Sequence, residues 1–170
     1  MADENLLKIG RDKVLTYINT TPSTTATYGL LGMGVTTGQI AMNANTTTEQ
    51  FIHQTTAYNS IDTYAPSFGV TQTAYKGDAV YDYIFGLYIN RATQSDAETD
   101  ILNIYLAETS NNAYLAEKQK VAIEISNYGG DAGNPVAIEY TIHFNGNHEK
   151  GTATITDGVP TFTADSTASL

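Results

Sequence analysis

The chain has 170 residues, of which only eight are Lys or Arg and 18 are Asp or Glu, so its formal net charge is −10. This balance argues against stable nucleic-acid binding, which needs clustered basic side chains that neutralise phosphates. The absence of cysteine excludes a disulfide framework, a thiolate nucleophile and a cysteine zinc site.

The length and composition predict one globular domain over residues 1–170, because domains commonly run to about 100–200 residues. No apolar run approaches the length of about 20 residues that a membrane span needs, so we expect no membrane insertion. The chain begins Met1-Ala2-Asp3-Glu4, without the basic and apolar regions of a signal peptide. We therefore expect a protein that is not exported by a cleaved signal and that assembles in a reducing cytosol.

Residues 14–75 contain no lysine or arginine and only two acids, Glu49 and Asp62. Solvated surface normally mixes charges of both signs, whereas few charges with many tyrosines are typical of protein–protein contacts. A buried core is a weaker reading, because Asn, Gln and Thr are too frequent. A disordered tract is disfavoured by the apolar residues Phe51, Ile52, Tyr58, Ile61, Tyr64 and Phe68. The segment predicts a large self-association surface.

The first half of the chain reads as short strands around a long insert. Residues 12–19 predict a strand, 20–27 a polar loop, and 28–44 strands broken by glycines. Residues 44–67 form the insert, predicted as a long inter-strand loop or extended hairpin. Residues 68–75 then alternate, with the residues of one face being Phe68, Val70, Gln72 and Ala74.

One helix follows, with Asp78 as its predicted N-cap and apolar residues at helical spacing up to Arg91 in its last turn. The remainder predicts strands at 100–108, 120–127, 135–144, 150–156 and 159–163. Asn145-Gly146-Asn147 and Asp157-Gly158 are read as the last two turns. Residues 164–170 are expected to be a flexible tail that docks on a neighbour. The fold class predicted is mainly β, an antiparallel β-sandwich or barrel with one flanking α-helix.

No pattern predicts catalysis. His53, His143 and His148 lack the convergent ligands of a metal site and are read as surface residues. Asp96-x-Glu98-x-Asp100 lacks the glycine and bidentate glutamate of a calcium loop. Gly32-Met33-Gly34 lacks the lysine of a phosphate-binding loop. We expect no enzymatic activity and no cofactor.

The two strands of the central predicted hairpin have an apolar face and an opposite face without lysine. That opposite face carries Ala122, Glu124, Ser126, Ala137, Glu139, Thr141 and His143. Like charges across a hairpin are unfavourable unless they are well solvated. The face is either ordinary solvent-exposed surface or a water-filled wall that stays negative and does not adhere to DNA.

The order of these elements resembles the major tail tube proteins of long-tailed (siphophage-like) bacteriophages. The likeness is carried by Tyr-Ala-Pro-Ser-Phe-Gly-Val at 64–70, by Gly-Asp-Ala-Val-Tyr at 77–81 before the helix, and by the glycines at 129, 130 and 133. The turn Asp157-Gly158-Val159-Pro160 also contributes. The similarity covers nearly the whole chain through its layout.

The resemblance implies a structural virion protein. Such proteins form hexameric rings in which strands of all subunits enclose a lumen, and stacked rings form a tube through which DNA is delivered to the host. Expected partners are further copies of the chain, the tape measure and tail terminator proteins, and DNA in transit. The expected location is the virion tail, assembled in the bacterial cytoplasm.

Two sets of residues follow from this reading. The lumen-lining candidates are Glu124, Glu139 and Gln72. An acidic lumen lets DNA slide without binding. The ring-stacking candidates are Phe51, Tyr58, Ile61 and Tyr64.

Two alternatives remain open. The tube protein of a contractile tail-like or type VI-like injection machine shares the architecture. A carbohydrate-binding β-sandwich module instead uses exposed tyrosines to stack on sugars.

Overall fold

The computed structural model describes residues 8–110 and 112–165, and its secondary structure is mainly β. These residues contain one α-helix, α1 (Ala79–Asn90), and two short 3-10 helices, η1 (Arg11–Lys13) and η2 (Gln94–Ala97). The strands are β1 (Val14–Asn19), β2 (Tyr28–Leu30), β3 (Gln39–Ala41), β4 (Ala44–Glu49), β5 (Tyr58–Tyr64), β6 (Ser67–Thr73), β7 (Glu98–Ser110), β8 (Ala113–Gly129), β9 (Ala137–Thr156) and β10 (Val159–Ala164).

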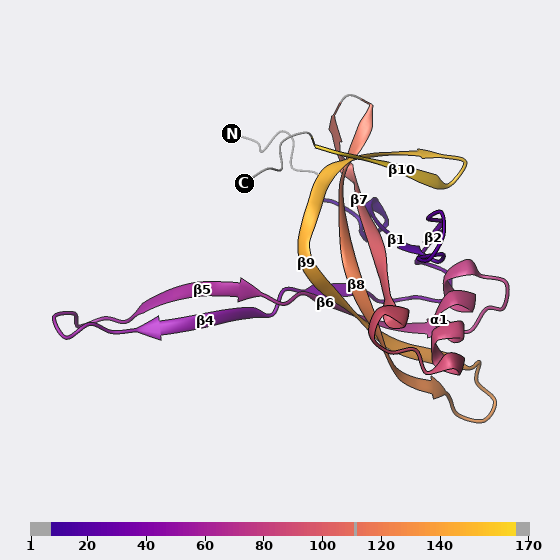
Figure 1. Ribbon diagram of the computed structural model, residues 1–170, viewed down its shortest axis with the longest axis horizontal. Coiled ribbons are helices and arrows are strands. Elements are labelled where there is room, and N and C mark those ends of the chain that lie inside the picture. The colour runs from indigo at the N-terminus through magenta and orange to yellow at the C-terminus, as the bar shows by residue number, and fades with distance from the viewer. Residues whose placement is uncertain (1–7, 111, 166–170) are drawn as a thin grey trace.

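Eight strands form one antiparallel sheet in the order β2-β1-β7-β8-β9-β6-β3, with β10 added to β9. Strands β8 and β9 are long and bent, so each takes part in two regions of the sheet (Figure 1). The first half of β9 pairs with β6, and its second half pairs with β10. The remaining strands, β4 and β5, form a separate two-stranded hairpin that projects from the body (Figure 1).

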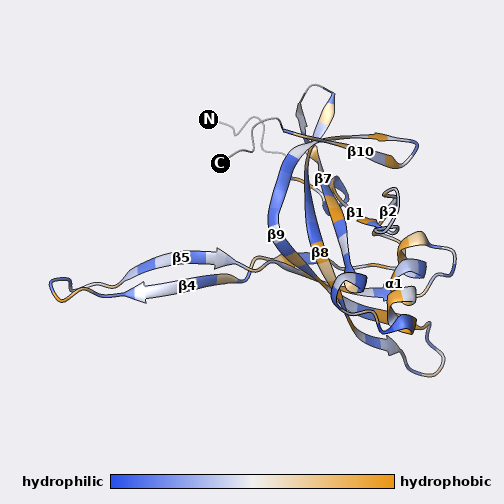
Figure 2. Cartoon of the chain, in the orientation of Figure 1, coloured by the Kyte–Doolittle hydropathy of each residue, from blue (hydrophilic) through white to orange (hydrophobic). Residues whose placement is uncertain are grey.

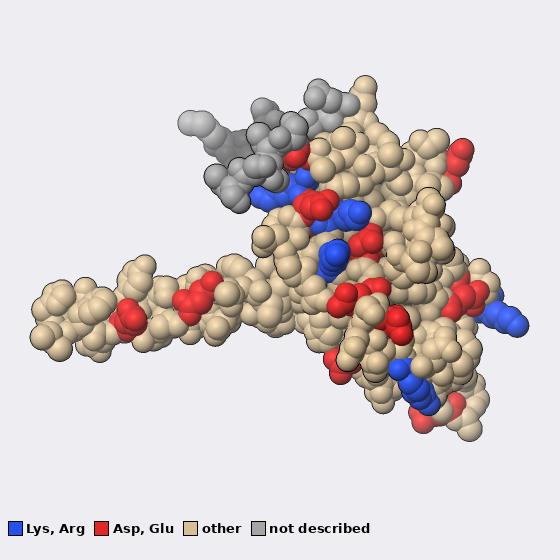
Figure 3. All heavy atoms as spheres, in the orientation of Figure 1, with Lys and Arg blue, Asp and Glu red and all other residues tan. Residues whose placement is uncertain are grey.

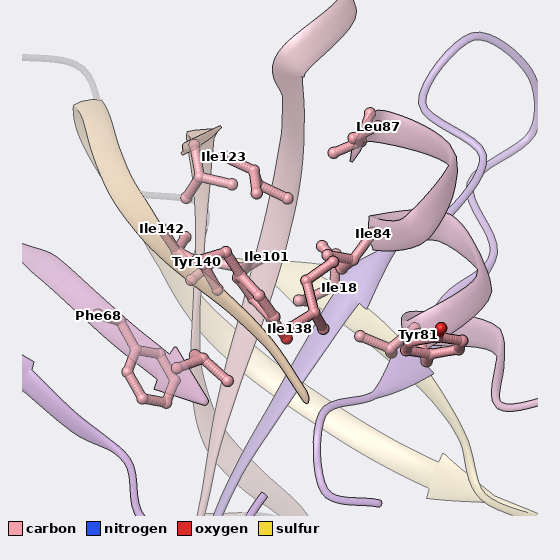
Figure 4. Close-up of a cluster of buried hydrophobic side chains, with 13 residues drawn as sticks. Ile18, Phe68, Tyr81, Ile84, Leu87, Ile101, Ile123, Ile138, Tyr140 and Ile142 are labelled. Atoms are coloured by element: carbon pink, nitrogen blue, oxygen red, sulfur yellow. The ribbon is translucent and has the colours of Figure 1, made fainter. Parts of the chain in front are cut away.

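Two apolar clusters lie within the sheet. The larger is covered by α1, whose Tyr81, Ile84 and Leu87 point toward sheet residues such as Ile138 and Ile142 (Figure 4). The smaller joins β1 and β7 to the second half of β9 through Tyr17, Leu102, Ile104, Ala116 and Ala153. The burial of these apolar side chains provides most of the stabilisation of the body.

The start of α1 follows the predicted capping chemistry. Asp78 has extended backbone and its carboxylate accepts a hydrogen bond from the Tyr81 amide at 2.9 Å. Arg91 lies one residue beyond the last turn, at the C-cap, with a left-handed φ of 51°. Its guanidinium carbon stands 4.5 Å from the centre of the Tyr88 ring, a cation–π contact that holds the end of the helix.

The predicted fold class is confirmed, and three boundaries are corrected. β7 extends two residues beyond the predicted 100–108 at each end, and β8 already begins at Ala113 instead of 120, because the two strands pair with each other there. The predicted turn at 145–147 is wrong, since β9 runs through it. Gly146 takes a φ of 65° there and its carbonyl accepts a hydrogen bond from Gln119 at 2.7 Å. The tail was predicted to begin at residue 164, but Ala164 is the last residue of β10. Residues 166–170 of this tail lie outside the described residues.

Candidate assembly surfaces

The predicted acidic face of the central hairpin exists and extends over three strands. In the register of β6, β9 and β8, Glu139 lies between Thr71 on one side and Asn127 on the other. Glu124 lies opposite Thr141. We call this surface, made of Thr71, Asn127, Glu124, Glu139, Thr141 and His143, the acidic face.

Both glutamates of the acidic face have a partner on the neighbouring strand. Glu124 Oε2 is 2.7 Å from His143 Nε2, and both side chains are exposed. Glu139 Oε2 accepts a hydrogen bond of 2.6 Å from the Asn127 amide. These contacts hold the carboxylates over the sheet without cancelling the charge of Glu139. The face therefore presents negative charge and small polar groups, as the sequence predicted.

Gln72 does not belong to the acidic face, so its prediction as a lumen-lining residue is wrong. Its side chain is completely buried, because β6 alternates and Gln72 shares the inner face with Phe68 and Val70. The amide donates to the Met33 carbonyl at 3.0 Å, and the Gln72 oxygen accepts from the Tyr140 hydroxyl at 3.0 Å. Its polar character is satisfied inside the core. The residue of β6 that belongs to the acidic face is Thr71.

The hairpin of β4 and β5 with its connection, residues 44–64, is called the arm. It is the extended hairpin that the sequence left as one option for this insert. Every residue of β4 is exposed, and in β5 only Ser60 is partly covered. A lone two-stranded hairpin is marginally stable in water. Because its side chains are exposed, the arm lacks the buried apolar contacts that stabilise the long strands of the body.

The predicted stacking residues all lie on the arm and are exposed. They are Phe51 (49%), Tyr58 (62%), Ile61 (57%) and Tyr64 (53%). At the tip, the Phe51 ring stacks on His53 with ring centroids 6.2 Å apart. The neighbouring Ile52 is fully exposed, and this tip is one of the apolar parts of the arm in Figure 2. Exposed apolar side chains in such number are typical of a contact surface.

The arm is poor in charge as well as apolar. Figure 3 shows acidic side chains on the arm and no basic ones, whereas the body carries both signs. Asp62 accepts hydrogen bonds from the Thr47 hydroxyl and, at 3.2 Å, from Ser60. The carboxylate is thus held against the arm by neutral hydroxyl groups.

The three histidines lie in two places on the molecule. His53 is at the tip of the arm, whereas His143 and His148 are exposed on β9. Within residues 8–110 and 112–165, no group of three or more His, Asp or Glu side chains could hold a metal ion. None of the described helices has the length and apolar composition of a membrane span.

No protein-family model matches the sequence, and no curated protein matches it. Several solved structures match its fold. The SPP1 tail tube aligns with a TM-score of 0.62 at 17% identity, over 84% of this chain and 78% of that one. The tail of an empty GTA particle, solved with C6 symmetry, gives 0.56 at 11% identity, over 83% and 97%.

A further match is the cap that terminates the tube of the anti-feeding prophage, with a TM-score of 0.52 at 12% identity, over 90% of this chain and 97% of that one. Identities this low establish the fold alone. The chain has the fold of tail tube proteins, as the resemblance in its sequence implied.

Proposed function

We propose that this chain is a non-enzymatic structural protein of a virion tail, and that copies of it stack into a tube through the arm. The observation that carries the proposal is the exposed, charge-poor arm on a body with the tail tube fold. Free in solution, the arm leaves Phe51, Tyr58, Ile61 and Tyr64 in water. Contact with another ring removes this apolar surface from solvent.

The rings are proposed to be hexameric, with the acidic face toward a lumen through which DNA passes. The C6 symmetry with which the GTA tail was solved supports six subunits in a tube of this fold. Glu124 and Glu139 supply repulsion toward phosphate, and Thr71 and Thr141 add neutral hydroxyls. DNA then meets a wall without basic residues that bind its backbone.

Electron microscopy of the purified protein tests the assembly. We expect rings or tubes for the wild-type chain. A variant with Phe51→Ser and Ile61→Ser is expected to lose tubes, because the apolar contacts between rings are removed. A matched control, Ile89→Ser, changes an equally exposed isoleucine on α1 (58%) and is expected to keep them. Wild-type protein that stays monomeric under all conditions tried would refute the proposed function.

The lumen assignment has its own test. Thr71→Lys and Glu139→Lys are expected to leave tube formation intact and to slow DNA ejection from particles, because each places a cation on the acidic face. Lys76→Ala, which removes a cation outside that face, serves as the control. Unchanged ejection in both lysine variants would contradict the lumen assignment while leaving the tube itself intact.

The tube of a contractile injection machine is the second candidate. It is favoured by a match to the sheath/tube terminator of an extracellular contractile injection system, with a TM-score of 0.52 at 8% identity, over 85% of this chain and 97% of that one. The two candidates differ in whether a sheath surrounds the tube. Co-purification of a sheath protein with tubes from the native source would favour the contractile machine.

A further inference from the structure

The sheet region that carries the acidic face has two unpaired edges. It consists of the end of β8, the first half of β9, β6 and β3. On β8, pairing with β7 stops at Ala122, so residues 123–129 have β9 on one side only. At the other end, β3 pairs with β6 alone among the described strands. Such edges invite pairing with another chain.

Two backbone hydrogen bonds between the ends of β6 and β9 fix which backbone groups point outward. Ala74 N donates to Val136 O at 2.8 Å, and Phe144 N donates to Pro66 O at 3.1 Å. Since backbone direction alternates along an antiparallel strand, the odd-numbered residues of β9 point toward β8. Thr141 therefore bonds with Glu124, and the amide and carbonyl of Ile125 point away from the sheet.

The same alternation applies at the other edge. Ala74 N bonds with β9, so Gly69 and Ser67 of β6 point toward β3. Their partners Gln39 and Ala41 point back toward β6, which leaves the amide and carbonyl of Ile40 directed outward. Each edge thus offers a complete donor and acceptor pair.

The β8 edge opens into a groove. A cavity of about 430 Å³ lies between the C-terminal end of α1 and β8. Its apolar lining is Leu87, Tyr88, Ala92, Ile123, Ile125 and Tyr128. Figure 4 shows Leu87 on the helix side and Ile123 on the sheet side. The groove provides space for side chains of an added strand, and its walls are those of the apolar cluster.

At both edges, corresponding side chains point to the same face of the sheet. Ile40 packs against the apolar cluster beneath α1, as does Ile125. Gln39 and Ala41 are exposed on the same side of the sheet as Ser67 and Gly69, which is also the side of Glu124. When β3 of one copy pairs with β8 of another so that Ile40 lies opposite Ile125, the apolar side chains of the added strand lie on the side of the groove. Its small neutral residues, Gln39 and Ala41, then lie beside the acidic face.

The strand count fits a repeating arrangement. The region has four antiparallel strands, so β3 of one copy runs antiparallel to β8 of the next when the sheet continues. The two edges differ from each other, and pairing them is a head-to-tail contact that generates a ring when the rotation closes. Met42, next to β3 and 51% exposed, then lies along the groove.

We propose that β3 of one copy adds to the free edge of β8 in the next copy, with Ile40 opposite Ile125 and Ala41 opposite Glu124. Met42 enters the groove beside α1. This pairing rests on the proposed function, since it names the contact between neighbours within a ring.

Disulfide trapping tests the register. The chain has no cysteine, so Ala41→Cys with Glu124→Cys introduces the only thiols. Opposed non-hydrogen-bonded residues lie close enough for a disulfide, and we expect a ladder of covalent multimers that reductant removes. Ala41→Cys with Glu139→Cys is the control, because Glu139 lies inside the sheet between β8 and β6. Rings whose 41 and 124 thiols stay unlinked would overturn the pairing and leave the proposed function standing.

A charge placed in the groove gives a second readout. Met42→Lys is expected to lower the yield of rings about tenfold or more, because it places a cation in a groove whose lining already includes Arg91. Met33→Lys is the matched control, since Met33 is similarly exposed (56%) but lies outside the groove. Circular dichroism checks that both variants fold. Equal ring yields for the two variants would overturn the pairing, and wild-type protein that forms no rings would overturn it together with the proposed function.

Discussion

β5 and β6 are consecutive strands of seven residues each, yet they occupy opposite environments. β6 lies inside the sheet and buries Phe68, Val70 and Gln72 on alternate positions. β5 lies on the arm, with Tyr58 and Ile61 exposed three residues apart. Side chains three apart on a strand point to opposite faces.

This difference shows that the spacing of apolar residues along a strand indicates whether the body of the molecule covers them. Alternation in β6 marks a strand with one buried face, which the body itself covers. The irregular spacing in β5 leaves apolar groups on both faces of the arm, and the body covers neither. The arm therefore has a surface suited to contacts between copies, whereas β6 has one suited to folding.

The largest expected effect comes from removing one isoleucine from each environment. Ile142→Ala, in the buried core, is expected to lower the free energy of unfolding by about 2–5 kcal/mol because it leaves a cavity. Ile61→Ala, on the arm, is expected to change it by less than about 0.5 kcal/mol while reducing tube formation. Urea unfolding of the unassembled protein measures the first quantity and electron microscopy the second. Equal losses of stability would remove the distinction between folding and assembly surfaces.

Adjacent residues of β6 sharpen the comparison further. Gln72→Lys is expected to destabilise the fold by at least about 2 kcal/mol, because it breaks the buried hydrogen bonds with Met33 and Tyr140 and buries a cation. Thr71→Lys, on the acidic face, is expected to cost less than about 0.5 kcal/mol. Thermal unfolding of the two variants compares them. A stable Gln72→Lys protein would contradict the core position of this side chain.

Buried tyrosines of the body are expected to make the stability of the fold depend on high pH. Burial raises the pKa of Tyr140, and burial together with Glu117 raises the pKa of Tyr105. The same cause raises the pKa of Tyr81 to about 12. Because the folded state holds these phenols neutral, their stabilisation is complete below the unfolded pKa of about 10 and is lost as the pH rises above it.

Unfolding free energies measured from pH 9 to 12 should fall, by up to about 1.4 kcal/mol per pH unit for each such tyrosine. Tyr105→Phe is expected to make the fall shallower. A slope that does not respond to Tyr105→Phe would show that this hydroxyl carries no part of the effect.

Much of the fold follows from local patterns in the sequence. The cap at Asp78, the alternation in residues 68–75 and the Asp157-Gly158 turn all predict what the structure has. The turn predicted at 145–147 is absent for a physical reason. Asn-Gly-Asn is typical of a turn, but here β8 pairs with β9 on both sides of it and Gly146 takes up the irregularity within the strand.

The candidate sites were predictable in part. Glu124 and Glu139 share a face because strands alternate, and this could be read from the sequence. Gln72 was assigned to a lumen from its polar character, although its alternation with Phe68 and Val70 already placed it on the inner face. The proposed pairing of β3 was not predictable, since the groove proposed to receive it in the next copy is built from α1 and β8, which come much later in the chain.

The register of β8 shifts between Ile125 and Asn127, opposite the first half of β9. A bulge of this kind bends its strand and increases the local twist. It lies at the free edge, so it orients whatever strand is added there. In the proposed ring, the angle between successive copies, and with it the circumference, is then encoded in one extra residue of the backbone. Deleting Ser126 is thus expected to change the curvature of the proposed ring while leaving the residues in its contacts the same.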